Sequence, residues 1–269
     1  MRDKPMDKPM DKPMGKPVDE PADKTGGARV DFQKEMEKLG RLYRVYDRAT
    51  AAFPVACKEK CDDCCTCNVV VTSLETAWLL SRLSKDEITG LRERLEAGVP
   101  EKRYQPGYTT NGFALACIEG RTLEDEENDP AWGKCPLLED GRCTVYHARP
   151  FGCRNMMSEA ACADAGYARM PELALTLNNI FLQYIEHMDY QGMSGNLTDM
   201  LVLYLKHAVP NGASGQKSHA FPLSLENLKD SDKTGIFIRN MKIPALMIPP
   251  EHRADAAPVL DEINALGQG

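Results

Sequence analysis

Apolar side chains recur at spacings of three and four residues along several stretches of the chain, and this spacing is typical of helices with one buried face. In the first stretch, Phe32, Met36 and Leu39 begin such a series, and the same spacing returns between Leu173 and Met188. The pattern predicts helices over residues 31–52, 74–83, 85–97, 173–188, 196–209 and 251–266, the last interrupted near Pro258.

Polar residues in front of two of these helices have the spacing of N-terminal caps. Thr72 with Glu75, and Ser84 with Glu87, fit a capping box, in which each side chain bonds the main-chain N–H of the other residue. Two short apolar runs, "NVVVT" and "GIFI", suit strands because they are too short for helices. The chain therefore combines helices with a few short strands.

The segment "CPLLEDGRCTVYHARPFGCR" at 135–154 contains two short apolar pieces on either side of "EDGR". Asp140 and Gly141 favour a tight turn, so a hairpin with these two residues at its tip is predicted. Residues 98–134 are rich in Gly, Pro and acidic side chains and predict a long irregular connection. The fold class is therefore α+β and mainly helical, with a small irregular core and a short hairpin packed with flanking helices.

The chain begins with near-perfect repeats of "DKPM", and a proline at every fourth position excludes helix and interior strand. Residues 1–28 are therefore predicted to form a disordered tail. Residues 29–170 contain all ten cysteines and are predicted to form one domain, and residues 171–269 a helical C-terminal region.

The formal net charge of −7 and the pI near 5.4 argue against a nucleic-acid partner, which requires a basic surface. No run of about 18 apolar residues predicts a membrane span, and the N-terminus lacks the apolar run of a secretion signal. The sequence therefore predicts a cytoplasmic protein. Thiols stay reduced in that compartment, so ten cysteines favour metal ligands or reactive groups over disulfides.

The stretch "CKEKCDDCCTC" is the densest group of cysteines. Cys57, Cys61 and Cys64 have spacings that let one turn of backbone present two thiolates to a single zinc or iron ion. Cys64 and Cys65 are adjacent, and adjacent side chains diverge by about 100° in a helix and by about 180° in a strand. The doublet therefore favours two ions or a polynuclear site.

Three further cysteines lie in the hairpin segment, at wider spacings. The hairpin is expected to bring Cys135 and Cys143 together across its base, with Cys153 following. A site built from both segments would close the long loop between them and so stabilise the fold.

These two segments resemble the YkgJ-like cysteine-cluster family, a zinc- or iron-chelating domain with a C-x-x-C-x-x-C-C motif. The resemblance covers residues 53–165 and rests on "CKEKCDDCC", on the hairpin segment with its Cys-Pro, Val-Tyr, Arg-Pro and Cys-Arg pairs, and on Cys162 as the last cysteine. One departure is the spacing of three residues, rather than two, after Cys57. The resemblance implies eight metal ligands: Cys57, Cys61, Cys64, Cys65, Cys135, Cys143, Cys153 and Cys162.

Other residues near these motifs are less favoured as ligands. Cys117, in "FALACIEG", reads as a buried apolar residue, and Cys67 either replaces a missing ligand or sits beside the site. With eight thiols available, His147 is expected at the surface or behind the ligands. Arg149 and Arg154 could offset the negative charge of the thiolates, or be ordinary surface residues.

Three functions remain open from the sequence. The first is metal binding by zinc or iron ions, and the second is an iron–sulfur cluster for electron transfer or an oxidoreductase reaction. The third is an interaction module in which metal holds the fold and the helical tail binds a partner protein. No phosphate-binding loop, dinucleotide motif, nucleophile elbow or His-Glu-x-x-His motif is present, so no catalytic residue is predicted.

Overall fold

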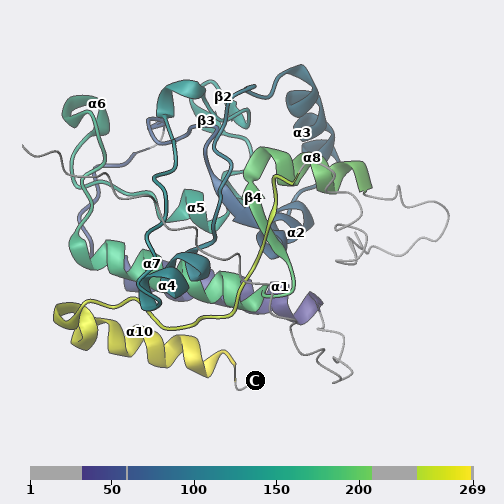
Figure 1. Cartoon of the computed structure of the whole chain (residues 1–269). Helices are drawn as coiled ribbons and strands as arrows, with labels where there is room; N and C mark the ends of the chain where they lie inside the picture. Colours follow the sequence, from purple (N-terminus) through teal and green to yellow (C-terminus); the bar gives the residue numbers. More distant parts are fainter. Residues whose placement is uncertain (1–31, 59, 208–234, 268–269) are drawn as a thin grey trace, which may run out of the picture. The chain divides into compact units, whose positions relative to one another are not determined.

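The computed structural model describes residues 32–58, 60–207 and 235–267, all of which lie within one compact unit, Asp31–Gly269. Helix α1 (Phe32–Ala49) packs against α7 (Glu172–Met188) and α10 (Arg253–Ala265), and Figure 1 shows these three helices stacked side by side. The helices predicted from apolar spacing at both ends of the chain are thereby confirmed. The predicted tail 1–28 lies outside the described residues.

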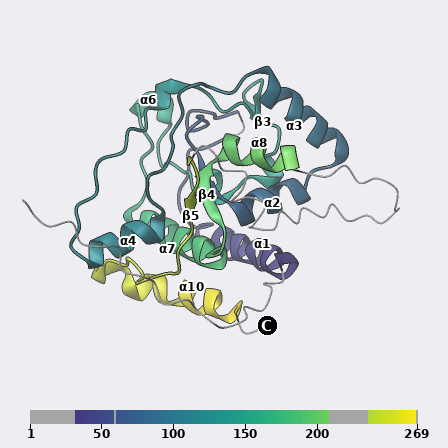
Figure 2. The same ribbon diagram turned by 45° about the vertical axis from the view of Figure 1, so that its right-hand side comes forward.

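An antiparallel sheet of three short strands draws on both halves of the chain. Its order is β1 (Val70–Thr72), β4 (Met193–Asn196) and β5 (Ile238–Arg239), with Val71 opposite Gly195 and Ser194 opposite Ile238. Helix α2 (Ser73–Ser81) follows β1 directly, and α8 (Leu197–His207) follows β4 (Figure 2). The mainly helical α+β fold and the strand in "NVVVT" agree with the prediction, whereas β4 was not predicted and β5 shares only Ile238 with "GIFI".

The predicted caps are present. Thr72 and Glu75 form a reciprocal capping box at the start of α2, and Ser84 with Glu87 does the same for α3 (Lys85–Ala97). Glu75 is almost fully buried and also accepts bonds from the Phe151 main-chain N–H at 2.8 Å and the Tyr43 hydroxyl at 2.9 Å. One capping residue therefore joins α1, α2 and the cysteine segment.

The predicted hairpin is confirmed. Strand β2 (Leu138–Glu139) pairs with β3 (Arg142–Cys143), with Leu138 opposite Cys143. Asp140 and Gly141 form the tip with φ angles of 50° and 75°, the left-handed values that a tight hairpin turn requires. Short helical turns follow at η2 (Tyr146–Ala148), α5 (Phe151–Arg154) and α6 (Cys162–Ala165).

Two predictions of secondary structure are wrong. Residues 98–134 are not irregular throughout: they contain α4 (Thr110–Ile118), capped by Thr109, and a 3-10 turn, η1 (Pro130–Trp132). Helix α10 follows the turn η3 (Pro250–His252) and continues through Pro258 instead of breaking there, because its packing against α1 outweighs one missing hydrogen bond.

Aromatic rings form the centre of the core. Tyr46 contacts Phe151 and Phe181 edge-on, with centroid distances of 4.7 and 5.1 Å, and Tyr43 meets Trp78 at 5.0 Å. Phe151 is fully buried and lies two residues before Cys153. The core therefore fixes the backbone that carries the downstream cysteines.

Candidate metal centre

The hairpin and the turn after it bring three cysteines into the same neighbourhood. Cys153 lies within electrostatic range of both Cys135 and Cys143, and all three side chains are partly buried. Burial raises the pKa of Cys135 to about 11 and also raises the pKa values of Cys143 and Cys153. Burial therefore favours the neutral thiol over the thiolate at these three residues. The thiolate form requires nearby positive charge or hydrogen-bond donors.

Part of that compensation comes from main-chain N–H groups two residues further on. The backbone of Leu137 bonds the sulfur of Cys135, and the backbone of Val145 bonds the sulfur of Cys143, each lowering the pKa of the thiol that it contacts. A hydrogen bond to a thiolate stabilises the charged form. Both turns thus favour thiolates, the form in which cysteine binds metal.

The upstream cysteines reach this site through paired main chains. The Cys135 N–H donates to the Cys65 carbonyl at 2.9 Å, and the Cys67 N–H donates to the Gly133 carbonyl at 2.9 Å. Between these bonds Thr66 and Lys134 form an isolated antiparallel bridge. The two cysteine segments, distant in sequence, are therefore joined side by side at residues 65–67 and 133–135.

Cys64 and Cys65 have different main neighbours, although Cys64 also lies within electrostatic range of Cys153. Cys65 lies within electrostatic range of Cys135, Cys143 and Cys153. A hydrogen bond from the Cys64 thiol to the Cys65 sulfur raises the pKa of Cys64 and lowers that of Cys65. Cys65, Cys135, Cys143 and Cys153 are here called the hairpin set.

The other set gathers around Cys57. This side chain lies within electrostatic range of Cys61, Cys64 and Cys162, and its pKa is raised by burial. The Ala56 N–H donates to the Ser158 carbonyl at 2.7 Å, which brings the start of the cysteine segment beside the chain that leads to Cys162. Cys57, Cys61, Cys64 and Cys162 are here called the outer set.

All eight cysteines singled out from the sequence thus fall into these two sets of four. Their sulfur atoms are not yet gathered into a binding geometry: among the described residues, no three His, Cys, Asp or Glu side chains are arranged to hold a metal ion. What the structure provides is the division of the thiols and their backbone support, without a closed ligand sphere.

The two remaining cysteines differ in position: Cys67 lies within electrostatic range of Cys135, and Cys117 lies at the surface of α4. Cys67 is 2% exposed, and its thiol contacts the Asn68 side chain at 3.4 Å and the Lys102 carbonyl at 3.8 Å. It therefore packs beside the hairpin set as a buried residue. Cys117 is exposed, so the prediction that it is a core residue is wrong: the short helix α4 presents it on its outer face.

The basic residues Arg149, Arg154 and His147 of the segment 135–154 have different surroundings. Arg149 lies within electrostatic range of Cys143 and Cys153 and lowers their pKa values, as expected of a residue that offsets thiolate charge. Arg154 instead pairs with Asp47 at 3.1 Å and stacks on Tyr43. His147 lies at the surface, 3.8 Å from Glu87, away from the thiols as predicted.

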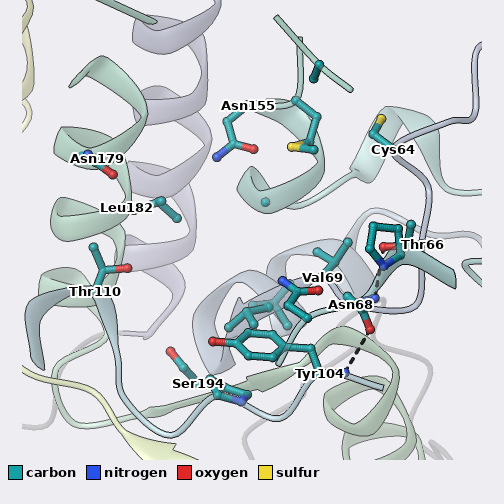
Figure 3. A pocket seen from close by; sticks show the side chains of 18 of the residues that line it. Cys64, Thr66, Asn68, Val69, Tyr104, Thr110, Asn155, Asn179, Leu182 and Ser194 are labelled. Atoms are coloured by element: carbon teal, nitrogen blue, oxygen red, sulfur yellow. Dashed lines mark hydrogen bonds between the residues drawn. The ribbon is translucent and has the colours of Figure 1, made fainter. Parts of the chain in front are cut away.

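A cavity adjoins the outer set. Cys64 and Cys162 line it together with residues of β1, α4, α5 and α7, and Figure 3 shows Cys64 at its edge. This cavity could not be predicted from the sequence, because its walls come from many short segments that lie far apart along the chain. The unanticipated helix α4 supplies one of them.

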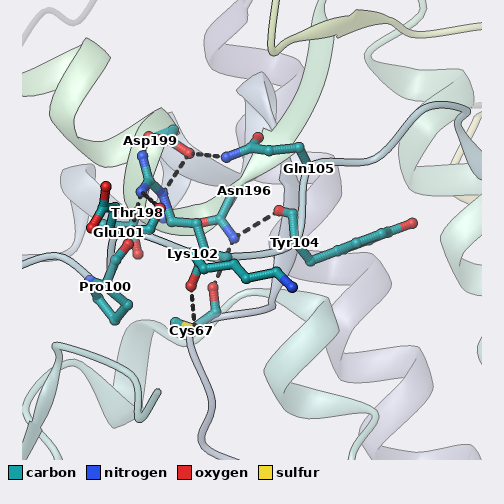
Figure 4. Close-up of polar contacts among 10 residues, drawn as sticks. Cys67, Pro100, Glu101, Lys102, Tyr104, Gln105, Asn196, Thr198 and Asp199 are labelled. Atoms are coloured by element: carbon teal, nitrogen blue, oxygen red, sulfur yellow. Dashed lines mark hydrogen bonds and ion pairs between the residues drawn. The ribbon is translucent and has the colours of Figure 1, made fainter. Parts of the chain in front are cut away.

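A polar network holds another wall in place (Figure 4). Arg103 forms an ion pair with Asp199 of α8, and Gln105 donates to the same carboxylate at 2.7 Å. The Asn196 side chain donates to the Cys67 carbonyl at 2.7 Å and the Tyr104 carbonyl at 3.1 Å. The segment carrying Tyr104 is thus fixed to both the sheet and the cysteine region.

Within the described residues, no helix has the length and apolar character needed to cross a membrane. Comparison of the chain with models of protein families, with curated proteins and with solved structures finds no match.

Proposed function

We propose that this protein binds two metal ions through eight cysteine thiolates, one ion in the hairpin set and one in the outer set. The observation that carries the proposal concerns the neighbours of the doublet: Cys65 lies within electrostatic range of Cys135, Cys143 and Cys153, whereas Cys64 lies within range of Cys57 as well as Cys153. Cys64 lies in a turn and its thiol hydrogen-bonds the Cys65 sulfur, so the two proposed centres would adjoin each other at the doublet. The resemblance to the YkgJ-like family supports the same eight ligands.

Zinc is the metal that this donor set suits best. Four thiolates without an open position are the usual ligands of a structural zinc ion, which they bind in a tetrahedron. Four thiolates around Zn²⁺ leave a charge of about −2, and Arg149 with the N–H groups of Leu137 and Val145 offsets part of it at the hairpin set. Reduced thiols are required, which is consistent with a cytoplasmic location.

Metal binding would add a second link between the two cysteine segments, which the main-chain pairing already joins. Each set joins cysteines from before residue 66 to cysteines after residue 134, so each ion would close a long loop and stabilise the folded state. The sulfur atoms must converge further than they do in the structure as described. The proposed role of the ions is therefore to hold the two segments together.

The test is metal analysis of the full chain purified without oxygen, combined with its absorption spectrum. We expect two zinc ions per chain and a colourless protein. Cys64→Ser and Cys65→Ser should each lose about one ion, because each removes one of the four ligands of a different centre. Cys117→Ser is the matched control and should retain both ions, since Cys117 is exposed and outside both sets.

Other results would contradict the proposal. Brown protein with acid-labile sulfide would instead support an iron–sulfur cluster. If Cys64→Ser and Cys65→Ser both left the metal content unchanged, neither set would be a metal site.

A further inference from the structure

The two sets of cysteines differ in their contact with the hydrophobic core. Cys135, Cys143 and Cys153 of the hairpin set pack against the buried core that includes Phe151 and Val145. None of the four cysteines of the outer set is among the described residues that form this core or pack against it. The hairpin set therefore borders the protein interior, whereas the outer set lies outside it.

A small molecule can approach the outer set from two sides. Cys57 is the only exposed member of the eight proposed ligands, all of which lie in the described part of the chain. Cys64 and Cys162 line the cavity shown in Figure 3, and no cysteine of the hairpin set is among its described lining residues. The cavity has a volume of about 1080 Å³, which is enough to admit a small organic molecule. The outer set is thus accessible both at the surface and from the cavity.

A charged residue of opposite sign accompanies each set. Arg149 lies within electrostatic range of Cys143 and Cys153 in the hairpin set. At the outer set, the Asp63 carboxylate lies 3.9 Å from the Cys61 sulfur and within electrostatic range of Cys64. An ion held by four thiolates has a net negative charge, which Arg149 attracts and Asp63 repels. The charges therefore favour retention of an ion in the hairpin set over retention in the outer set.

Access decides whether an ion can leave a set of four thiolates. In a ligand exchange, the sulfur of an incoming thiol binds the zinc ion and one cysteine sulfur leaves it. The proton released by the incoming thiol passes to the departing cysteine, so one Zn–S bond forms as another breaks and no oxidant is needed. The incoming sulfur must reach the ion, and the structure leaves this approach open at the outer set.

We propose that the outer set is an exchangeable metal site, which passes its zinc ion by ligand exchange to a small uncharged thiol, whereas the hairpin set retains its ion. The inference rests on the proposed function, since it requires both ions. The acceptor is uncharged because the described lining of the cavity contains Asp63 and no Lys, Arg or His, so an anion would be repelled there. One set is thus assigned to metal transfer and the other to holding the fold.

The test follows zinc loss from the full chain carrying two zinc ions. EDTA is present throughout as the final acceptor, and native mass spectrometry counts the ions that remain on each chain over time. We expect 2-mercaptoethanol to speed the loss of the first ion at least about tenfold over EDTA alone, with little effect on the second. 2-Mercaptoethanesulfonate, a thiol of similar size with a negative charge, should speed the first loss less.

Alkylation of the unmodified protein identifies which ion leaves first. When one ion has been lost, the added thiol is removed and N-ethylmaleimide is applied, and peptide mass spectrometry locates the modified cysteines. Cysteines of the outer set should become reactive at this stage, whereas those of the hairpin set should stay protected. This measurement requires no substitution, so it does not depend on the folding of a variant.

Asp63→Asn tests the approach of the acceptor. The substitution removes the negative charge beside the outer set, so the difference in rate between the two thiols should become smaller. Glu93→Gln is the matched control, because it removes an exposed carboxylate on α3 that does not line the cavity, and it should leave the difference unchanged. An undiminished difference in Asp63→Asn would overturn the proposed approach.

Three further results would overturn the inference: loss of both ions at the same rate, first alkylation at the hairpin set, or faster zinc loss with the anionic thiol than with the uncharged one. These outcomes are distinct from a failure of the proposed function. A protein that binds no zinc, or one ion only, would refute the proposed function before any exchange is measured. Two ions that leave together would refute the exchangeable site alone.

Discussion

At the scale of single residues, the sequence favoured two ions or a polynuclear site at the doublet, because adjacent side chains diverge in a helix or a strand, and this stays a prediction. It could not predict which partners each thiol would meet, because Cys162 and Cys135 reach the doublet only through long-range main-chain contacts. The prediction that Cys117 is a core residue was wrong because its apolar neighbours belong to a short helix that is not buried on all sides.

Three buried carboxylates were also missed, because the carboxylate of an acidic residue shows no sign of burial in the sequence alone. Asp189 is the clearest case. Its carboxylate accepts bonds from the Ser73 hydroxyl at 2.5 Å, the Leu74 N–H at 3.0 Å and the Asn240 side chain at 2.9 Å. Burial nevertheless dominates and raises the pKa of Asp189 to about 7 from 3.8.

This raised pKa predicts a specific pH dependence of stability. Between about pH 4 and pH 7 the folded protein holds a proton on Asp189 that the unfolded chain releases. The free energy of unfolding therefore falls as the pH rises, by about 1.4 kcal/mol per unit from this group, and no further above its folded pKa. Urea unfolding at pH 5 and pH 7.5 should show this loss, and Asp189→Asn should reduce it.

Glu262→Gln is the control for that measurement. Glu262 is an exposed carboxylate paired with Arg48, so its removal should leave the pH dependence nearly as it is. A pH dependence in Asp189→Asn identical to that of the unmodified protein would refute the assignment.

At the scale of elements, apolar spacing and capping residues located the long helices because both signals are local. Thr72 and Ser84 marked the starts of α2 and α3 correctly for this reason. Helix α4 was not predicted from the sequence, because its nine residues include Gly112 and follow a stretch that contains Pro100 and Pro106. Its position depends on a long-range contact, in which the Asn111 side chain bonds Gln183 of α7. At Pro258 the local sequence predicted a break in the helix, but tertiary packing maintains α10 through this residue.

The tip of the hairpin offers a test at this scale. Gly141 has a φ of 75°, and a Cβ there would meet only Lys60 at an ordinary distance of 3.9 Å. Gly141→Ala should therefore lower the free energy of unfolding by about 1 kcal/mol through backbone strain alone. Thermal unfolding of the variant and of the unmodified protein measures the change.

Asp140→Gly is the matched variant, because it relieves a left-handed φ of 50° at the neighbouring position. It should leave stability the same or slightly higher. Equal destabilisation by both changes would show that side-chain contacts, and not the turn, decide the outcome.

At the scale of the whole molecule, the sheet unites chain segments on both sides of residue 170. Strand β1 comes from the cysteine-containing part, and β4 and β5 come from the part beyond it. No local pattern signals such pairing, which arises only when long-range contacts compensate for loop closure. The sequence thus indicated the elements and the eight thiols, whereas their assembly follows from packing.

The aromatic core predicts that distant packing supports the thiols. Phe181 of α7 stacks on Phe151 at 5.7 Å, and Phe151 precedes Cys153 by two residues. Phe181→Ala should cost about 3–5 kcal/mol in the free energy of unfolding. It should also speed the loss of zinc to a chelator, measured with a colorimetric metal indicator.

Leu175→Ala, an exposed position on the same helix, is the control and should change neither quantity appreciably. Loss of stability in Phe181→Ala without faster zinc release would separate the core from the metal sites and contradict this link.

The division of the doublet also has a consequence for the order of events during synthesis. Cys57 to Cys65 leave the ribosome first, yet their partners at 135–162 follow only after the intervening chain has been made. At roughly 5–20 residues per second, the nascent chain carries these four thiols without their partners for several seconds. Neither set of four can be completed locally, so the proposed metal binding must wait for the downstream segment to emerge.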